Sequence, residues 1–474
     1  MNEMDRTSSA KRRRWIIWVL ILVVAVALIA WLLYWIDTGG GAFEDALAEA
    51  RAMGGPVTID ELLEARREWD DDENGALVME SLGERLSTVL EGEDIDALPI
   101  VGSAKLPPLG ERWSAELSQP VDAELQRLSD ELASIDTLAR YEGGRFYRDT
   151  PPNPYDMLLP NLSPLRQCAK LKSLQTVHRA AQGRFSSVAD DVDVLLRHGK
   201  LVKDEPFLIC LLVRIACDAV VVQTIEQVCA QGQLEPQQLK RIEQQLAGID
   251  YSGGLVLAMR GERAVLIGAA ERALAGGDAG FLVLRYGRLP FVRGWRKRNF
   301  AVAVRMYNRL VAAASDPRGV VEVARQVMSE TEDLPWYYTV TKQVVPSLSR
   351  ATQMPLKLAA HIRSARTALA MERYRIDVGR FTNRLEDLVP DYMPEVLTDP
   401  FDGEPLRYRM TADRLVIYSV DVDMVDDGGH VRENKEEGEG KPKDVGFVLL
   451  APAMRGRAPQ ARTSSAPAEA GNPP

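Results

Sequence analysis

The segment from Trp15 to Ile36 restricts the fold of this chain more than any other feature, because its 22 consecutive residues carry no charge. As an α-helix rising ~1.5 Å per residue, it would span roughly 33 Å, which is enough to cross a bilayer. Tryptophans at positions 15, 18, 31 and 35 lie near its two ends, where amphipathic rings prefer the headgroup region. The segment therefore predicts a transmembrane helix over residues 15–36.

The charges around this segment predict its orientation. Lys11 and three arginines at 12–14 precede it, whereas Asp37 and Glu44 follow it. Positive residues favour the cytoplasmic side, so residues 1–14 are expected in the cytoplasm and the bulk of the chain in the periplasm or another extracytoplasmic space. The expected location is the inner, cytoplasmic membrane, crossed once. The alternative is a cleaved signal peptide, for which Gly39 to Ala42 would be a weak cleavage site.

A second apolar run, Phe207 to Val222, has to be weighed as another span. Arg214 and Asp218 interrupt it, and the uninterrupted part is shorter than the ~20 residues that a span needs. As an i,i+4 pair these two residues can neutralise each other on one helix face. We therefore expect a buried helix of a folded domain here, and only one membrane span.

Charge and motifs exclude several functional classes. The 474 residues include 58 Lys and Arg against 68 Asp and Glu, a formal net charge of -10, so no broad basic surface is expected to hold nucleic acid. The sequence contains no GxSxG, P-loop, dinucleotide-binding or HExxH motif, and no catalytic residues are assigned. The four histidines occur singly and favour surface or capping positions. The four cysteines fit no zinc spacing, and whether any pair is bridged is left open.

The spacing of apolar residues and turn signals divides the exported part into four segments. Residues 37–120 alternate short helical patterns with loops, and residues 121–350 predict an irregular domain of antiparallel helices. Residues 351–450 form a distinct C-terminal module, and residues 451–474 are rich in Ala, Pro, Ser and Gly, which predicts a disordered tail. The fold class is therefore α+β, mainly α.

The C-terminal module predicts one long helix followed by a small antiparallel sheet. Leu356 to Val378 has helical spacing and ends at Gly379. The runs at 406–410 and 414–420 predict a β-hairpin, and the run at 445–450 a third strand beside it. Such a module has its own apolar helix face and strand faces, so it is expected to fold as one unit.

The stretch from Glu372 to Arg409, followed by YSVDVDMVDDGG at 418–429, resembles the C-terminal half of the major, G-type pseudopilin of type II secretion systems. It is also similar to a pseudopilin-like module found in uncharacterised membrane-anchored proteins of planctomycetes. The positions that carry the resemblance are Tyr374, Gly379, Arg380, Leu385, Leu388, Pro390, Tyr392, Pro394, Asp399, Pro400, Phe401, Gly403 and Tyr408. The resemblance implies a helix-plus-sheet fold and a link to secretion or to organisation of the cell envelope.

The chain also departs from the pseudopilin pattern. Its hydrophobic helix lacks the prepilin-peptidase site, and roughly 300 residues separate that helix from the module. Thr382 stands where the family usually has proline. Assembly into a pseudopilus through the N-terminal helix is therefore not expected, although the fold of the module is.

An acidic loop follows the predicted hairpin and supplies candidate metal ligands. Its carboxylates are the hard oxygen donors that Ca²⁺ prefers, and the resembling pseudopilins hold a calcium ion in this loop. The alternative is a solvated acidic loop without a metal. The candidate calcium ligands are Asp421, Asp423, Asp426, Asp427 and Asp444.

These features predict a non-enzymatic, single-pass membrane protein whose extracytoplasmic part binds other proteins of the envelope. The membrane contact is expected through residues 15–36, and no nucleic-acid partner is expected. The alternative is an extracytoplasmic enzyme whose active residues are scattered over the helical domain, where one sequence does not reveal them.

Overall fold

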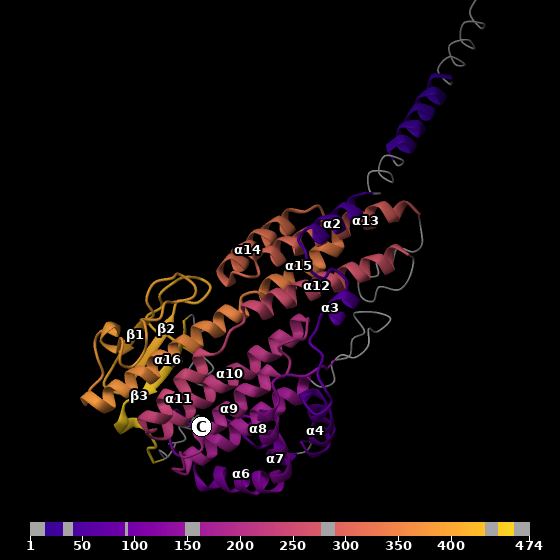
Figure 1. The fold of residues 1–474 in the computed structure, drawn as a ribbon. Coiled ribbons are helices and arrows are strands. Elements are labelled where there is room, and N and C mark those ends of the chain that lie inside the picture. The colour runs from indigo at the N-terminus through magenta and orange to yellow at the C-terminus, as the bar shows by residue number, and fades with distance from the viewer. Residues whose placement is uncertain are drawn as a thin grey trace, which may run out of the picture.

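The computed structural model describes residues 15–31, 41–90, 93–146, 162–275, 290–431 and 444–458. Within these ranges the chain is mainly helical and contains one three-stranded antiparallel sheet near its C-terminal end (Figure 1). This confirms the coarse prediction of a mainly helical α+β protein. One hydrophobic core runs through the body, from Phe43 to Leu449.

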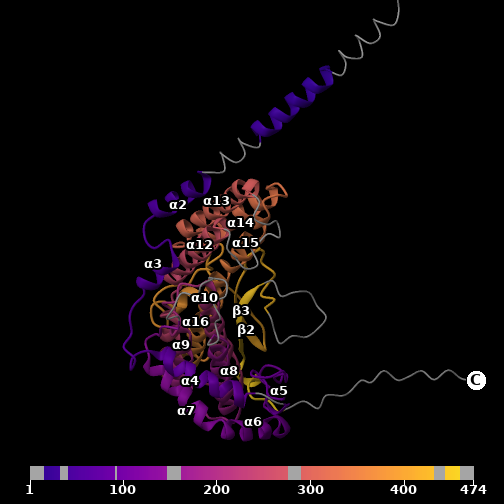
Figure 2. The same cartoon turned by 90° about the vertical axis from the view of Figure 1, so that its right-hand side faces the viewer.

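The N-terminal apolar segment is helical from Trp15 to Trp31, as far as the structure describes it. Its side chains are exposed, with Trp18 at 69 % and Leu22 at 64 %. Figures 1 and 2 show this helix apart from the folded body. The predicted continuation to Ile36 lies outside the described residues.

Short helices form the first part of the body, and local side chains explain several of their starts. Thr58 and Glu61 make a reciprocal capping box at one start, and the side chains of Asn74 and Ser114 accept backbone N–H groups at two others. These elements are α2 (Ala42–Ala52), α3 (Ile59–Glu64), α4 (Gly75–Val89), α5 (Glu93–Asp96), α6 (Ala115–Arg127), α7 (Ser129–Thr137) and η1 (Leu138–Arg140).

Longer helices follow. They are α8 (Leu162–Ala181), α9 (Val188–Lys200), α10 (Leu208–Gln231), α11 (Pro236–Ala247), α12 (Ser252–Leu274), α13 (Pro290–Ala313), α14 (Pro317–Asp333) and α15 (Thr339–Ala351). In Figure 1, α2 and α12 to α15 gather at the end of the body nearest the N-terminal helix, and α4 and α6 to α9 at the opposite end.

Helix α10 contains the second apolar run, and it lies in the core of the body. It packs against α8, α9, α12 and α16. By length and composition it could cross a membrane, but most of its apolar window is buried inside the protein. Arg214 and Asp218 lie 4.0 Å apart, and the hydroxyl of Tyr251 donates a hydrogen bond to Asp218. These contacts compensate the buried charge and fit a core helix.

The C-terminal module consists of α16 (Met354–Val378), η4 (Leu385–Leu388), β1 (Arg407–Met410), β2 (Arg414–Ser419) and β3 (Val445–Leu450). The strand order is β1-β2-β3, with Tyr408 opposite Ile417 and Val416 opposite Val448. Helix α16 packs on β2 and β3 and also on α10 and α11. The module therefore shares its core with the helical domain.

The edge of β3 is also joined to the helical domain. The backbone N–H of Val448 donates to the carboxylate of Glu226 on α10, at 2.7 Å. On one sheet face, Val416 and Val448 pack with Ala230 at the end of α10. Both contacts tie the sheet to the same helix.

The expected tail begins later than the sequence suggests. Residues 451–458 are packed, and η5 (Pro452–Met454) is part of them. Gly456 donates to the carbonyl of Ala230, and the carbonyl of Arg457 accepts from Arg112. The composition of the segment does not indicate these contacts, because they consist of a few backbone hydrogen bonds and the buried side chain of Arg455. Residues 459–474 lie outside the described residues.

Candidate functional site

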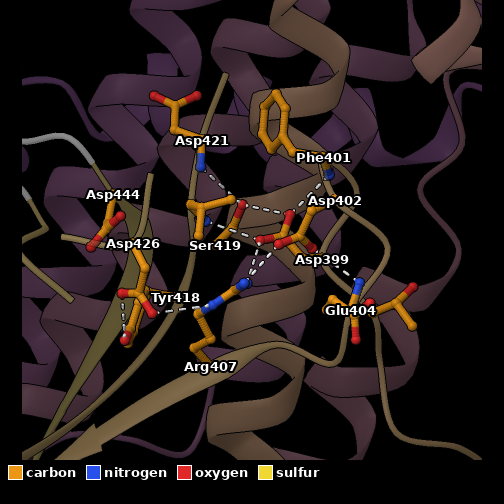
Figure 3. Close-up of polar contacts among 12 residues, drawn as sticks. Asp399, Phe401, Asp402, Glu404, Arg407, Tyr418, Ser419, Asp421, Asp426 and Asp444 are labelled. Carbon is orange, nitrogen blue, oxygen red and sulfur yellow. Dashed lines mark hydrogen bonds and ion pairs between the residues drawn. The ribbon is translucent and has the colours of Figure 1, made fainter. Parts of the chain in front are cut away.

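The turn between η4 and β1 is built around the buried carboxylate of Asp399 (Figure 3). Its Oδ1 accepts from the backbone N–H of Phe401 and from the hydroxyl of Ser419, both at 2.8 Å. Its Oδ2 accepts from the backbone N–H of Val420 at 2.9 Å and lies 3.4 Å from Nη1 of Arg407. One side chain thus fastens the turn to both strands at the open end of the β1–β2 hairpin.

The rest of the turn explains its sequence. Gly403 has φ +87°, and a Cβ there would lie 2.8 Å from Nη1 of Arg318, so both conformation and space favour glycine. Phe401 is buried in the core. Arg318 on α14 donates to the carbonyls of Pro400 at 2.7 Å and Asp399 at 3.0 Å. The turn is therefore held from the helical domain as well as from the sheet.

Arg407 connects this turn to the acidic loop. Its guanidinium lies 2.7 Å from Asp402 and 3.3 Å from Asp426. Asp426 also accepts from the hydroxyl of Tyr418 at 3.1 Å. Burial and the hydrogen bond to Asp426 raise the pKa of Tyr418 to about 12, so its hydroxyl stays protonated and donating near neutral pH.

Three of the five predicted calcium ligands lie together. The carboxylate of Asp444 accepts from the backbone N–H groups of Gly429 at 2.8 Å and of Asp427 at 3.4 Å. Burial raises the pKa of Asp444, and the nearby charges of Asp427 and Asp426 raise it further. Mutual repulsion among these carboxylates is therefore present at this end of the loop.

The other two predicted ligands are engaged elsewhere or exposed. Asp421 pairs with Lys357 of α16 at 2.8 Å, and in Figure 3 its carboxylate points away from those of Asp426 and Asp444. Asp423 is exposed and accepts from the N–H of Val425 at 3.2 Å. Among the described residues, no group of three or more His, Cys, Asp or Glu side chains is arranged to hold a metal ion. The five carboxylates do not fit one calcium shell in this arrangement, and calcium binding stays a prediction.

Two histidines and all four cysteines are buried. The burial of His178 and His198 corrects the expectation of surface positions for these two, whereas His430 is exposed. His178 pairs with Asp122 at 2.8 Å, and His198 contacts the carbonyl of Val194 at 2.7 Å. Burial lowers the pKa of His198 to about 4, so this ring is neutral under ordinary conditions. All four cysteines, Cys168, Cys210, Cys217 and Cys229, are buried free thiols.

Sequence reasoning missed two ion pairs of α16, one with the C-terminal segment and one with the helical domain. Glu372 on α16 pairs with Arg455 at 2.5 Å, and Glu243 on α11 pairs with Arg366 on α16 at 2.9 Å. Their partners lie 83 and 123 positions away, so no local spacing reveals them.

Several positions that carry the pseudopilin resemblance have local structural reasons in this fold. Gly379 adopts φ +85° and ends α16, while Leu385 and Leu388 are buried. The hydroxyl of Tyr408 donates to the carbonyl of Asn383.

Comparisons of this chain with family models, curated proteins and solved structures give no match. The likeness to pseudopilins therefore rests on the residues themselves.

Proposed function

We propose that this chain is a single-pass membrane protein whose extracytoplasmic part binds other proteins of the cell envelope. In this proposal residues 15–36 form the anchor, and the C-terminal unit is a pseudopilin-like interaction module. The observation that carries the proposal is the exposed apolar helix at Trp15–Trp31, next to a body whose core begins at Phe43. Exposed apolar area of this kind is costly in water and suits a bilayer.

Ion pairs between distant segments fix the body of the protein internally. Arg66 and Glu205 pair at 2.6 Å, and Lys172 and Asp191 pair at 2.7 Å, all with side chains no more than 6 % exposed. The members of each pair neutralise one another and are engaged within the body.

The sheet provides the candidate contact surface for a protein partner. Strand β1 lies at one edge of the sheet, and its last residue, Met410, is 38 % exposed. Edge strands are a common place for another chain to add. The pseudopilin-like module would present this edge away from α16.

Two measurements test the proposal. Deleting residues 15–36 should move the protein from an alkali-resistant membrane fraction to the soluble fraction. A photo-crosslinker at Met410 should give a discrete adduct in intact cells, whereas one at Arg325, which is 56 % exposed on α14, should not. A deleted chain that remains membrane-bound would contradict the anchor. Identical crosslinking from both positions would contradict the contact surface.

A further inference from the structure

A cavity of about 640 Å³ lies where the helical domain meets the C-terminal module. Its walls come from the end of α11, the start of α14, the first half of α16 and Pro400 of the buried turn. This volume falls within the range of roughly 300–1,000 Å³ that is typical of sites for small molecules. The sheet, the acidic loop and the N-terminal helix take no part in it.

Three arginines from two helices line this cavity: Arg318 on α14, and Arg363 and Arg366 on α16. Arg318 donates to the carbonyls of Pro400 and Asp399, and Arg363 donates to the carbonyl of Thr398 at 2.7 Å. Backbone carbonyls fix these guanidinium groups in place without neutralising their charge. Arg366 differs, because its charge is paired with Glu243 at 2.9 Å.

The electrostatic surroundings of Arg363 are positive. Burial lowers the pKa of Arg363, and the charges of Arg318 and Arg366 lower it further, opposed in part by Asp399 and Glu395. Two carboxylates also line the cavity. Asp316 caps α14 by accepting from the N–H of Arg318 at 3.0 Å, and Asp250 is exposed. Guanidinium groups held near one another in a half-buried space gain stability when an anion lies between them.

The remaining wall is apolar. Ile249, Pro317 and Ala359 line the cavity and are partly exposed, whereas the lining side chains of Leu246, Leu356 and Ile362 are almost fully buried. A few fixed polar groups beside an apolar wall are the usual composition of a site that binds an organic molecule.

We propose that this cavity binds a small organic anion. The carboxylate or phosphate group of the ligand lies against the guanidinium groups of Arg318 and Arg363, and its apolar portion packs on Ile249, Pro317 and Ala359. Because Arg318 belongs to the helical domain and Arg363 to the module, the ligand stabilises the junction between them. This site does not depend on the membrane anchor or on any protein partner.

Binding to the full-length chain in detergent is measured by calorimetry with four probes. Phenyl phosphate and benzoate carry the two candidate anionic groups, benzyl alcohol is the neutral match, and inorganic phosphate lacks the apolar portion. We expect saturable binding of at least one aromatic anion at one site per chain, at least about tenfold tighter than benzyl alcohol. Whichever of phenyl phosphate and benzoate binds more tightly identifies the acid group of the ligand. Weaker binding of inorganic phosphate than of phenyl phosphate shows that the apolar wall contributes to affinity.

Variants locate the site. Arg363→Gln and Arg318→Gln should each weaken anion binding about tenfold or more, whereas Arg325→Gln removes a charge from α14 outside the cavity and should leave it unchanged. Arg363→Lys keeps the positive charge and should retain part of the affinity. Thermal unfolding of each variant checks that it is folded. If Arg363→Gln does not fold, the affinity of Arg318→Gln for the anion tests the site. The proposal is overturned if neither aromatic anion binds at millimolar concentrations, or if Arg318→Gln binds as tightly as the unaltered chain.

Discussion

Glu372 of α16 and Arg455 of the C-terminal segment form a buried ion pair, with 2.5 Å between Oε1 and Nη1 and side chains 2 % and 4 % exposed. Arg375 also contacts Glu372, at 2.8 Å. Burial alone would raise the pKa of Glu372, but the hydrogen bonds from Arg375 and Arg455 outweigh it and hold the pKa below its ordinary value. The end of the folded chain is thereby fastened to the long helix of the module.

This pair predicts that the fold needs residues beyond β3. A chain that ends at Leu450 loses Arg455 and the backbone hydrogen bonds of Gly456 and Arg457, while Glu372 keeps Arg375. Its free energy of unfolding should therefore fall by about 2 kcal/mol or more. A chain that ends at Ala458 keeps the pair and should unfold like the full chain. Chemical denaturation of both truncated chains measures the difference. Equal stability of the two would show that the pair contributes nothing.

Asp399 should be the most sensitive residue of the buried turn. Asp399→Asn places an amide where the carboxylate accepts from two backbone N–H groups, the Ser419 hydroxyl and Arg407. The loss of a buried, hydrogen-bonded charge is expected to cost about 3 kcal/mol of unfolding free energy.

Asp402→Asn is the matched control. Asp402 also pairs with Arg407, but its side chain is 21 % exposed, so its loss should cost no more than about 1 kcal/mol. Denaturant titrations of the two variants test the comparison. A larger loss in Asp402→Asn would contradict the role given to Asp399.

The carboxyl of Glu226 should make stability depend on pH. Burial raises its pKa from 4.5 to about 7, and the N–H of Val448 opposes this only in part. The unfolded chain therefore loses this proton at lower pH than the folded chain does. Its contribution to stability is fully present below pH 4.5 and is lost as the pH rises through about 7.

Glu226→Gln keeps an oxygen for Val448 and removes the titration. The variant should be more stable than the unaltered chain at pH 8, and the two should approach each other near pH 5. Glu332→Gln, at an exposed position of α14, serves as the control and should leave the free energy of unfolding unchanged at both pH 5 and pH 8. Unfolding measured between pH 5 and pH 8 decides. A Glu226→Gln chain with unchanged pH dependence would refute this account.

Calcium binding is tested on the full chain in detergent. The prediction is that millimolar calcium raises the melting temperature, because a dication relieves repulsion among Asp426, Asp427 and Asp444, and that a chelator reverses the rise. Asp427→Asn should reduce this rise, whereas Asp423→Asn, an exposed position apart from the cluster, should not. Identical melting curves in calcium and chelator would favour a solvated acidic loop.

The sequence predicts the secondary structure of the module well, because its signals are local. Apolar spacing marks α16, a glycine with positive φ ends it, and two strands flank a short turn. The register of the strands and the burial of Leu385 and Leu388 agree with these signals. A local feature also argues against a membrane span at Phe207–Val222: the charged pair Arg214 and Asp218 interrupts the run.

Contacts between distant segments could not be predicted in the same way. Glu226 meets Val448 across 222 positions, and the arginines of the cavity come from α14 and α16. The acidic loop shows the same limit, since its closely spaced aspartates diverge: Lys357 engages Asp421 and Arg407 engages Asp426. The sequence shows that these carboxylates belong to one loop. Which of them lie close together depends on partners elsewhere in the fold, such as Lys357 and Arg407.

The topology of the chain tests the central proposal most directly. A reporter that is active only outside the cytoplasm is fused in separate chains before Lys11 and after Pro474, so that the packed segment ending at Ala458 stays intact. The basic cluster before the apolar helix predicts an inactive N-terminal fusion and an active C-terminal fusion. A C-terminal fusion that is active only with a cytoplasmic reporter would contradict the extracytoplasmic placement of the body.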